Sequence, residues 1–96
     1  MMDEINNSSF SPTREASASF HDDGVVILHT GKGRLFSSNR TGAQIWRGIE
    51  QQLPVELIVQ QLSGEYQIPL NTAREHTAGF LAHLQRHELV QQEARQ

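Results

Sequence analysis

The sequence has no cysteine, and it has few aromatic residues: four Phe, one Trp and one Tyr among 96 residues. The absence of cysteine excludes disulfide bonds, thiolate metal sites and a thiol nucleophile, and it fits a reducing compartment. No apolar run approaches the roughly 20 residues of a membrane span. The polar, acidic start MMDEINNSSF also lacks the basic and apolar regions of a signal peptide. We therefore expect a cytoplasmic protein with no membrane contact.

Positive charge is also scarce, because eight Lys and Arg face eleven Asp and Glu and leave a net charge of -3. Proteins that bind nucleic acid by neutralising phosphates usually carry an excess of positive charge. The balance disfavours that class, although a local basic face is still compatible with it. With 96 residues and 36% hydrophobic content, the chain can build one modest core. We expect a single domain that acts through one compact fold or through a partner.

The residue pattern divides the chain into a polar start, an extended region and a helical region. Residues 1–13 are rich in polar residues and hold little apolar surface, so we expect a disordered segment there and a folded domain over residues 14–96. Alternating apolar residues and the run Val25–Leu28 then predict three antiparallel strands. Turns at Asp22–Gly24 and Gly31–Gly33 supply the glycines that tight hairpins favour.

Apolar residues at helical spacing follow the extended region. Three helices are predicted, over about residues 39–51, 54–64 and 71–87. Ser38 or Asn39 can cap the first helix and Asn71 or Thr72 the third, because short polar side chains accept hydrogen bonds from free backbone N–H groups. Pro54 suits the first turn of the second helix. The predicted fold class is α+β: a winged helix-turn-helix domain with a three-stranded antiparallel sheet followed by three helices.

Many winged helix-turn-helix domains bind DNA, and the third predicted helix is the candidate recognition helix. It carries only Arg74 and Arg86 as permanent cations. A base-reading helix usually presents several Arg, Asn or Gln side chains, with further cations nearby for phosphates. This helix offers few such groups, so a winged-helix DNA-binding regulator ranks second, as the alternative hypothesis.

No Ser, His or Asp stands in a nucleophile motif such as G-x-S-x-G, so we expect neither catalysis by this chain nor a cofactor.

Four short motifs follow one another along residues 24–90. They are the hairpin VVILHTGKGRLF, N-x-T-G-x-x-I-W over residues 39–46, V-x-x-I-V-x-x-L over 55–62, and F-L-x-x-L over 80–84 before Leu89-Val90. In this order the chain resembles the PqqD-like family, also called RiPP recognition elements. Two positions depart from the family's usual pattern. Ser38 stands in place of a leucine, and His76 stands in place of an acidic residue.

This resemblance implies a non-catalytic domain that binds the leader segment of a ribosomally synthesised precursor peptide. It would present that peptide to a separate modifying enzyme or leader peptidase, in lasso-peptide or pyrroloquinoline quinone biosynthesis, with the lasso type favoured. Physically, the last strand of the sheet can be an edge whose unpaired backbone groups accept an extended peptide as a further strand. The same edge could instead pair with a second copy of the chain and form a homodimer.

The peptide would then lie between the last strand and the third helix. At 100° per residue, His76, His83 and His87 share one shoulder of that helix beside its core stripe. Gly79 lies next to them, and because a mid-helix glycine costs about 1 kcal/mol relative to alanine, close approach by a ligand is one reason to keep it. The opposite shoulder, which holds Arg74, stays open as an alternative. The predicted peptide-binding residues are Lys32, Arg34, Leu35, Phe36, Ala73, His76, Gly79, Phe80 and His83.

The histidines of this helix also raise the question of a metal site. His83 and His87 are four residues apart, a spacing that can place two ligands on one metal ion. No acidic residue or cysteine completes a ligand set in the sequence. We therefore predict structural histidines and no metal.

Overall fold

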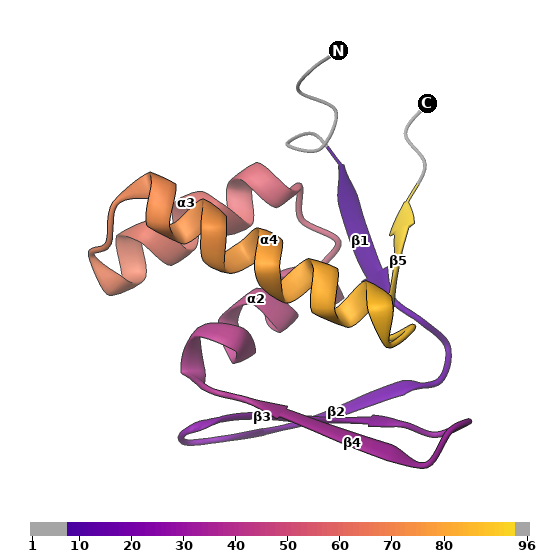
Figure 1. Cartoon of the computed structure of the whole chain (residues 1–96). Helices are drawn as coiled ribbons and strands as arrows, with labels where there is room; N and C mark the ends of the chain where they lie inside the picture. Colours follow the sequence, from indigo (N-terminus) through magenta and orange to yellow (C-terminus); the bar gives the residue numbers. More distant parts are fainter. Residues whose placement is uncertain (1–7, 94–96) are drawn as a thin grey trace.

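Residues 8–93, which the computed structural model describes, fold into two antiparallel sheets and three helices (Figure 1). The strands are β1 (Ser9–Pro12), β2 (Ala16–His21), β3 (Gly24–His29), β4 (Arg34–Ser38) and β5 (Val90–Glu93). The helices are α2 (Arg40–Glu50), α3 (Val55–Tyr66) and α4 (Leu70–Arg86). The predicted α+β class and the predicted number of helices are confirmed.

The three predicted strands form the sheet β2–β3–β4, with β3 in the middle and all pairs antiparallel. Ile27 lies opposite Ala18 on one side and Phe36 on the other, so these residues share the face that packs on the helices. Gly24 begins β3 at a point where a Cβ atom would lie 1.9 Å from the Ser38 carbonyl oxygen. Only glycine therefore lets the start of β3 approach the end of β4.

A second sheet, formed by β1 and β5, was not predicted. The expected disorder over residues 1–13 is wrong for residues 9–12, which form β1, and residues 1–7 lie outside the described residues. In this sheet Phe10 lies opposite Gln92. Phe10 is only 2% exposed, and its burial in the core anchors a strand whose other residues are two serines and a proline. The folded domain thus begins before residue 14.

The first helix begins as the sequence predicted. Asn39, and not Ser38, is the N-cap of α2, because its Oδ1 accepts a hydrogen bond from the Gly42 N–H at 3.1 Å. This cap ties the end of β4 directly to the start of the helix. Figure 1 shows the result, with α2 placed between the three-stranded sheet and the other two helices.

The later helix boundaries differ from the predicted ones. Helix α3 continues past Gly64 to Tyr66, and Gln67 then ends it in the left-handed conformation with a φ of 54°. Helix α4 begins at Leu70 behind Pro69, with no capping hydrogen bond from a side chain. The predicted cap at Asn71 or Thr72 is therefore wrong. Proline with its fixed φ takes the N-cap position of both helices, since Pro54 precedes α3 in the same way.

The core lies between the inner face of the larger sheet and α2, and it continues between α2 and the other two helices. Its largest buried side chains include Trp46, Ile49 and Leu62 from the helices and Ile27 from β3. Trp46 is anchored further, because its Nε1 donates a hydrogen bond to Glu50 Oε2 at 2.9 Å. No helix within residues 8–93 is both long and apolar enough to cross a membrane.

Candidate functional site

A groove of about 450 Å³ lies where the end of β4, the first turns of α2 and the middle of α4 converge. Ile45 and Phe80 give it an apolar floor, and polar side chains such as His76 and Asn39 form its rim. The full lining is Ser38, Asn39, Thr41, Gly42, Ile45, Glu75, His76, Gly79, Phe80 and His83. An apolar hollow with a few convergent polar groups is the usual form of a binding site.

Two glycines shape this groove in different ways. A Cβ atom on Gly42 would lie 2.1 Å from Ser38 Oγ and 3.2 Å from Phe80 Cζ, so glycine allows α2 to approach both β4 and α4. A Cβ atom on Gly79 would meet nothing within 4 Å. Gly42 thus permits the close packing of the elements that form the groove, and Gly79 leaves free space for a ligand to occupy.

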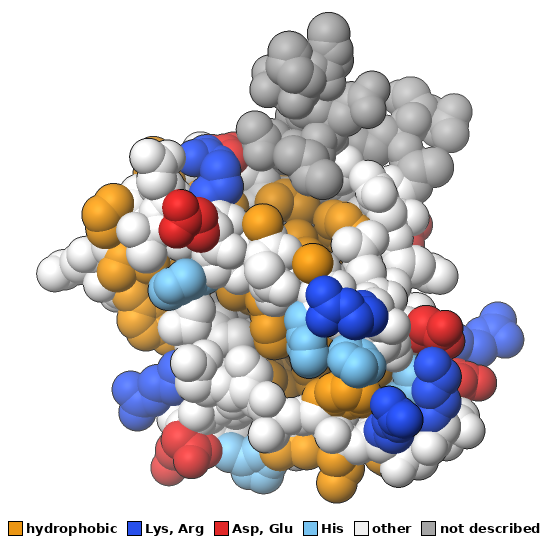
Figure 2. Space-filling model, in the orientation of Figure 1, with side chains coloured by type: hydrophobic (Ala, Val, Ile, Leu, Met, Phe, Trp, Pro, Cys, Tyr) orange, Lys and Arg blue, Asp and Glu red, His pale blue; other side chains and the backbone are white. Residues whose placement is uncertain are grey.

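An aromatic cluster extends the wall between β4 and the end of α4. The Phe36 ring lies 4.7 Å from the His87 ring and 6.1 Å from the His83 ring, and the two histidine rings lie 4.6 Å apart. Figure 2 shows neighbouring histidines against hydrophobic side chains on this face. Partial burial lowers the pKa of His87, and electrostatic repulsion from the neighbouring His83 and Arg86 side chains lowers it further. The lowered pKa favours the uncharged form of the His87 ring.

Strand β4 leaves one side of its backbone open. Within the described part of the chain it pairs with β3 alone, so it is an edge of the three-stranded sheet. Because successive side chains alternate between faces, Phe36 points toward α4 whereas Leu35 lies with Leu28 on the outer face. Leu35 is 69% exposed there. An extended segment could add to this edge with its side chains directed alternately into the groove and away from it.

The structure brings together four of the predicted peptide-binding residues. These are His76, Gly79, Phe80 and His83, which all line the groove from α4. Phe36 joins them through its contact with His83. Ala73, in contrast, has no exposed surface and belongs to the core, so it cannot contact a peptide in this conformation.

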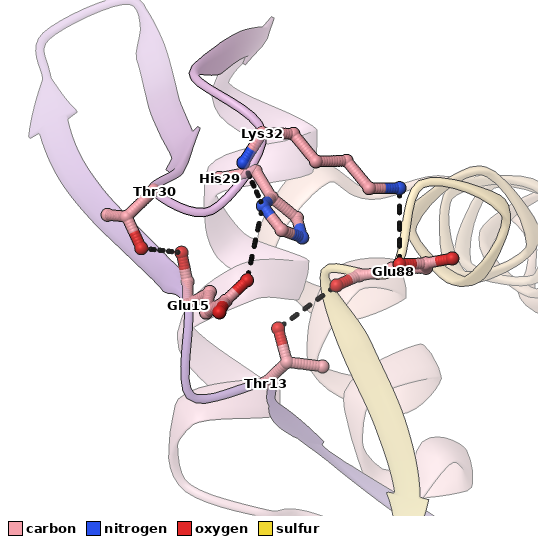
Figure 3. Close-up of polar contacts among 6 residues, drawn as sticks. All are labelled: Thr13, Glu15, His29, Thr30, Lys32 and Glu88. Carbon is pink, nitrogen blue, oxygen red and sulfur yellow. Dashed lines mark hydrogen bonds and ion pairs between the residues drawn. The ribbon is translucent and has the colours of Figure 1, made fainter.

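The remaining predicted residues of the edge lie outside the groove lining. Leu35 lies on the outer face and Arg34 at the far end of β4, opposite His29. Lys32 is tied to the turn after α4, because its Nζ lies 3.1 Å from Glu88 Oε1 (Figure 3). Its backbone N–H also donates to His29 Nδ1 at 3.1 Å. Lys32 therefore joins the β3–β4 turn to the C-terminal part of the fold.

Residues at the start of α2 also line the groove, and they were not predicted as site residues. Thr41, Gly42 and Ile45 belong to the motif N-x-T-G-x-x-I-W, which was interpreted as a helix start and core anchor. Their spacing along one helix face was the available signal. Glu75 was missed as well, although it neighbours His76 on α4.

The opposite shoulder of α4 faces α3. Arg74 Nη2 lies 2.9 Å from both carboxylate oxygens of Glu56, so this cation is already paired within the fold. One of the two permanent cations on this helix is thus paired with a carboxylate. In the part of the chain described, no three His, Asp or Glu side chains gather in a way that could hold a metal ion.

Comparison with known proteins gives the family. The chain belongs to the family described as coenzyme PQQ synthesis protein D (PqqD), whose pattern matches residues 24–90. The resemblance drawn from the motifs is thus confirmed. No match was found among curated proteins.

Two solved structures are similar to this chain. One, described as TbiB1 in complex with the TbiA(β) leader peptide, is 28% identical, with a TM-score of 0.79 over 88% of this chain and 99% of that chain. The other, described as lasso peptide synthetase B1 complexed with the leader peptide, is 23% identical, with a TM-score of 0.78 over 86% of this chain and 98% of that one. The second likeness shows the fold alone. Neither comparison supports the DNA-binding alternative.

Proposed function

We propose that this protein binds the leader segment of a ribosomally synthesised precursor peptide and presents it to a separate modifying enzyme or leader peptidase. The observation that carries this proposal is the open edge of β4 beside the groove formed with α2 and α4. The leader adds as a further antiparallel or parallel strand, and alternate side chains enter the groove.

The groove supplies the sequence selectivity that backbone pairing lacks. Hydrogen bonds to β4 give affinity for any extended chain, whereas the pocket over Ile45 and Phe80 selects a side chain with a large apolar surface. Polar groups at the rim, including His76 and Glu75, can then fix the orientation of that side chain. His76 replaces the acidic residue usual in the family, so the leader that fits here differs from other leaders at the group that meets this position.

The role is that of a carrier, with no catalysis by this chain. Holding the substrate next to an enzyme raises its local concentration to the millimolar range when the links are short and flexible. A lasso-type pathway is favoured over pyrroloquinoline quinone synthesis in this proposal, and the two similar solved structures are both described with a leader peptide. We retain a winged helix-turn-helix description of the fold and a cytoplasmic location as parts of this proposal.

An NMR titration of the ¹⁵N-labelled protein tests the proposal. The ligand is the leader of a short precursor encoded beside the gene, with duplex DNA as the control. We expect the leader to shift amides along β4 and those of Gly42, His76 and Gly79. Shifts on adding DNA, together with no response to the leader, would overturn the proposal in favour of the DNA-binding regulator.

The edge strand could be blocked by a second copy of the chain. Sedimentation at several protein concentrations, without and with the leader, tests this. We expect a monomer mass that rises only by the mass of the peptide. A concentration-dependent dimer that excludes the leader would show that β4 serves self-association instead.

A further inference from the structure

A second pocket, of about 320 Å³, lies on the other side of α2 from the groove. It is bounded by α2, the end of β2 and the end of α3. Its polar lining includes His21, Arg40, Gln44, Arg47, Gln51 and Tyr66. This pocket has no part in the leader-binding site described above.

The two pockets use different faces of the same helix. Arg40, Gln44, Arg47 and Gln51 follow the spacing i, i+4, i+7 and i+11, which places them in one stripe along α2. The groove instead takes its α2 residues from the neighbouring positions 41, 42 and 45. The two linings share no residue, so a ligand in the second pocket would leave the groove accessible.

The second pocket is basic in a chain whose net charge is -3. Its lining holds two guanidinium groups and no carboxylate. Within residues 8–93, the ion pairs involve neither Arg40 nor Arg47. Two unpaired cations at the wall of one hollow favour an anionic ligand.

Both guanidinium groups are held in position by the fold. Arg40 Nε donates a hydrogen bond to the Asp22 carbonyl oxygen at 2.9 Å. The Arg47 guanidinium carbon lies 4.0 Å from the centre of the Phe20 ring, a geometry in which the cation is stacked on the aromatic face. Each contact orients the group and leaves terminal nitrogens for a ligand. Arginine held in this way suits bidentate binding of a carboxylate.

We propose that this pocket binds an acidic segment of the protein that receives the leader, with its Asp or Glu carboxylates on Arg40 and Arg47. The glutamine side chains favour a peptide over a phosphate, because a carboxamide both donates and accepts hydrogen bonds whereas a phosphate ester oxygen mainly accepts. Gln44 and Gln51 can thus pair with the backbone of the segment. The choice of partner rests on the proposed function, whereas the acidic chemistry of the ligand rests on the pocket itself.

The test uses NMR titration of the labelled full chain with acetyl-hexaglutamate amide. We expect amide shifts on the α2 stripe and at His21 and Tyr66. The double variant R40Q/R47Q should bind this peptide about tenfold more weakly or worse, because two charge-assisted contacts are lost. The matched control R14Q/R86Q changes the net charge equally, at exposed positions outside the pocket, and should retain binding.

Three outcomes would overturn the proposal: hexaglutamine that binds as well as hexaglutamate, an equal loss of binding in the control variant, or inorganic phosphate that produces the same shifts at the same concentration. Leader affinity is measured in parallel on every variant. Retained leader binding in R40Q/R47Q is expected, and its loss would show that the pocket belongs to the leader site. Failure of the leader to bind the unaltered chain would contradict the proposed function while leaving the acidic pocket to be judged by its own titration.

Discussion

Gly42 on α2 lies so close to Ser38 on β4 that a Cβ atom at position 42 would sit 2.1 Å from Ser38 Oγ and 2.6 Å from Ser38 Cβ. A contact this short cannot be relieved by rotation of the Ser38 hydroxyl alone, because the Cβ atom is fixed to the strand. The glycine therefore sets the distance between the edge strand and α2, and with it the width of the groove.

Replacing this glycine should damage both the fold and the site. We expect G42A to lower the free energy of unfolding by about 1–3 kcal/mol, because the new methyl group overpacks a buried position. Leader affinity should fall as well, since β4 must move away from α2. Urea denaturation and calorimetric titration measure the two effects. G64A on α3, where a Cβ atom meets nothing, is the control and should be as stable as the parent or more stable.

Gly79 allows the groove to be filled without disturbing the core. We expect G79L to reduce leader affinity about tenfold or more, because the leucine occupies the space left for the peptide side chain. Stability should not fall, since leucine is a better helix former than glycine and its Cβ meets no neighbour. G64L is the matched control at an open helical glycine far from the groove. Equal leader affinity for G79L and G64L would show that α4 does not contact the leader at Gly79.

The sequence was enough to predict the larger sheet and the start of α2. The β-branched run of β3 and the glycines of its two turns are local signals, and so is Asn39, whose side chain caps the helix it precedes. Strand β1 could not be predicted in this way. Its four residues, SFSP, become a strand because they pair with β5 near the other end of the chain.

The candidate site was predictable in part for a similar reason. Helical periodicity placed His76, Gly79 and His83 on one shoulder of α4, and all three line the groove. Periodicity gives the direction of a side chain but not its depth, so Ala73 was assigned to the site although it is buried. The contribution of α2 depends on how β4, α2 and α4 converge in the folded protein, and the sequence of a single segment does not reveal this.

The hydroxyl group of Thr77 is buried in the core and has no hydrogen-bond partner. Because burying an unpaired polar group is unfavourable, T77V should raise the free energy of unfolding by about 1 kcal/mol. T13V is the contrasting variant, since Thr13 Oγ1 donates to the Glu88 carbonyl oxygen and its loss should destabilise the fold. Urea denaturation of both variants measures these changes in the free energy of unfolding. A destabilised T77V would mean that the hydroxyl is paired in solution.

The lowered pKa of His87 should make stability depend on pH. Its pKa in the folded state lies below the ordinary value of 6.5, so the unfolded chain binds the proton more tightly. The contribution of His87 to stability is therefore greatest above pH 6.5, falls as the pH drops through 6.5, and levels off below the folded pKa. We expect H87Q to lose less stability than the parent between pH 7.5 and 5.5, as measured by the midpoint of urea denaturation. H21Q, which removes an exposed histidine away from the aromatic cluster, is the comparison variant. If stability falls in parallel in all three proteins as the pH is lowered, other groups cause the pH dependence. The uncharged state of the His87 ring beside Phe36 would then have no support.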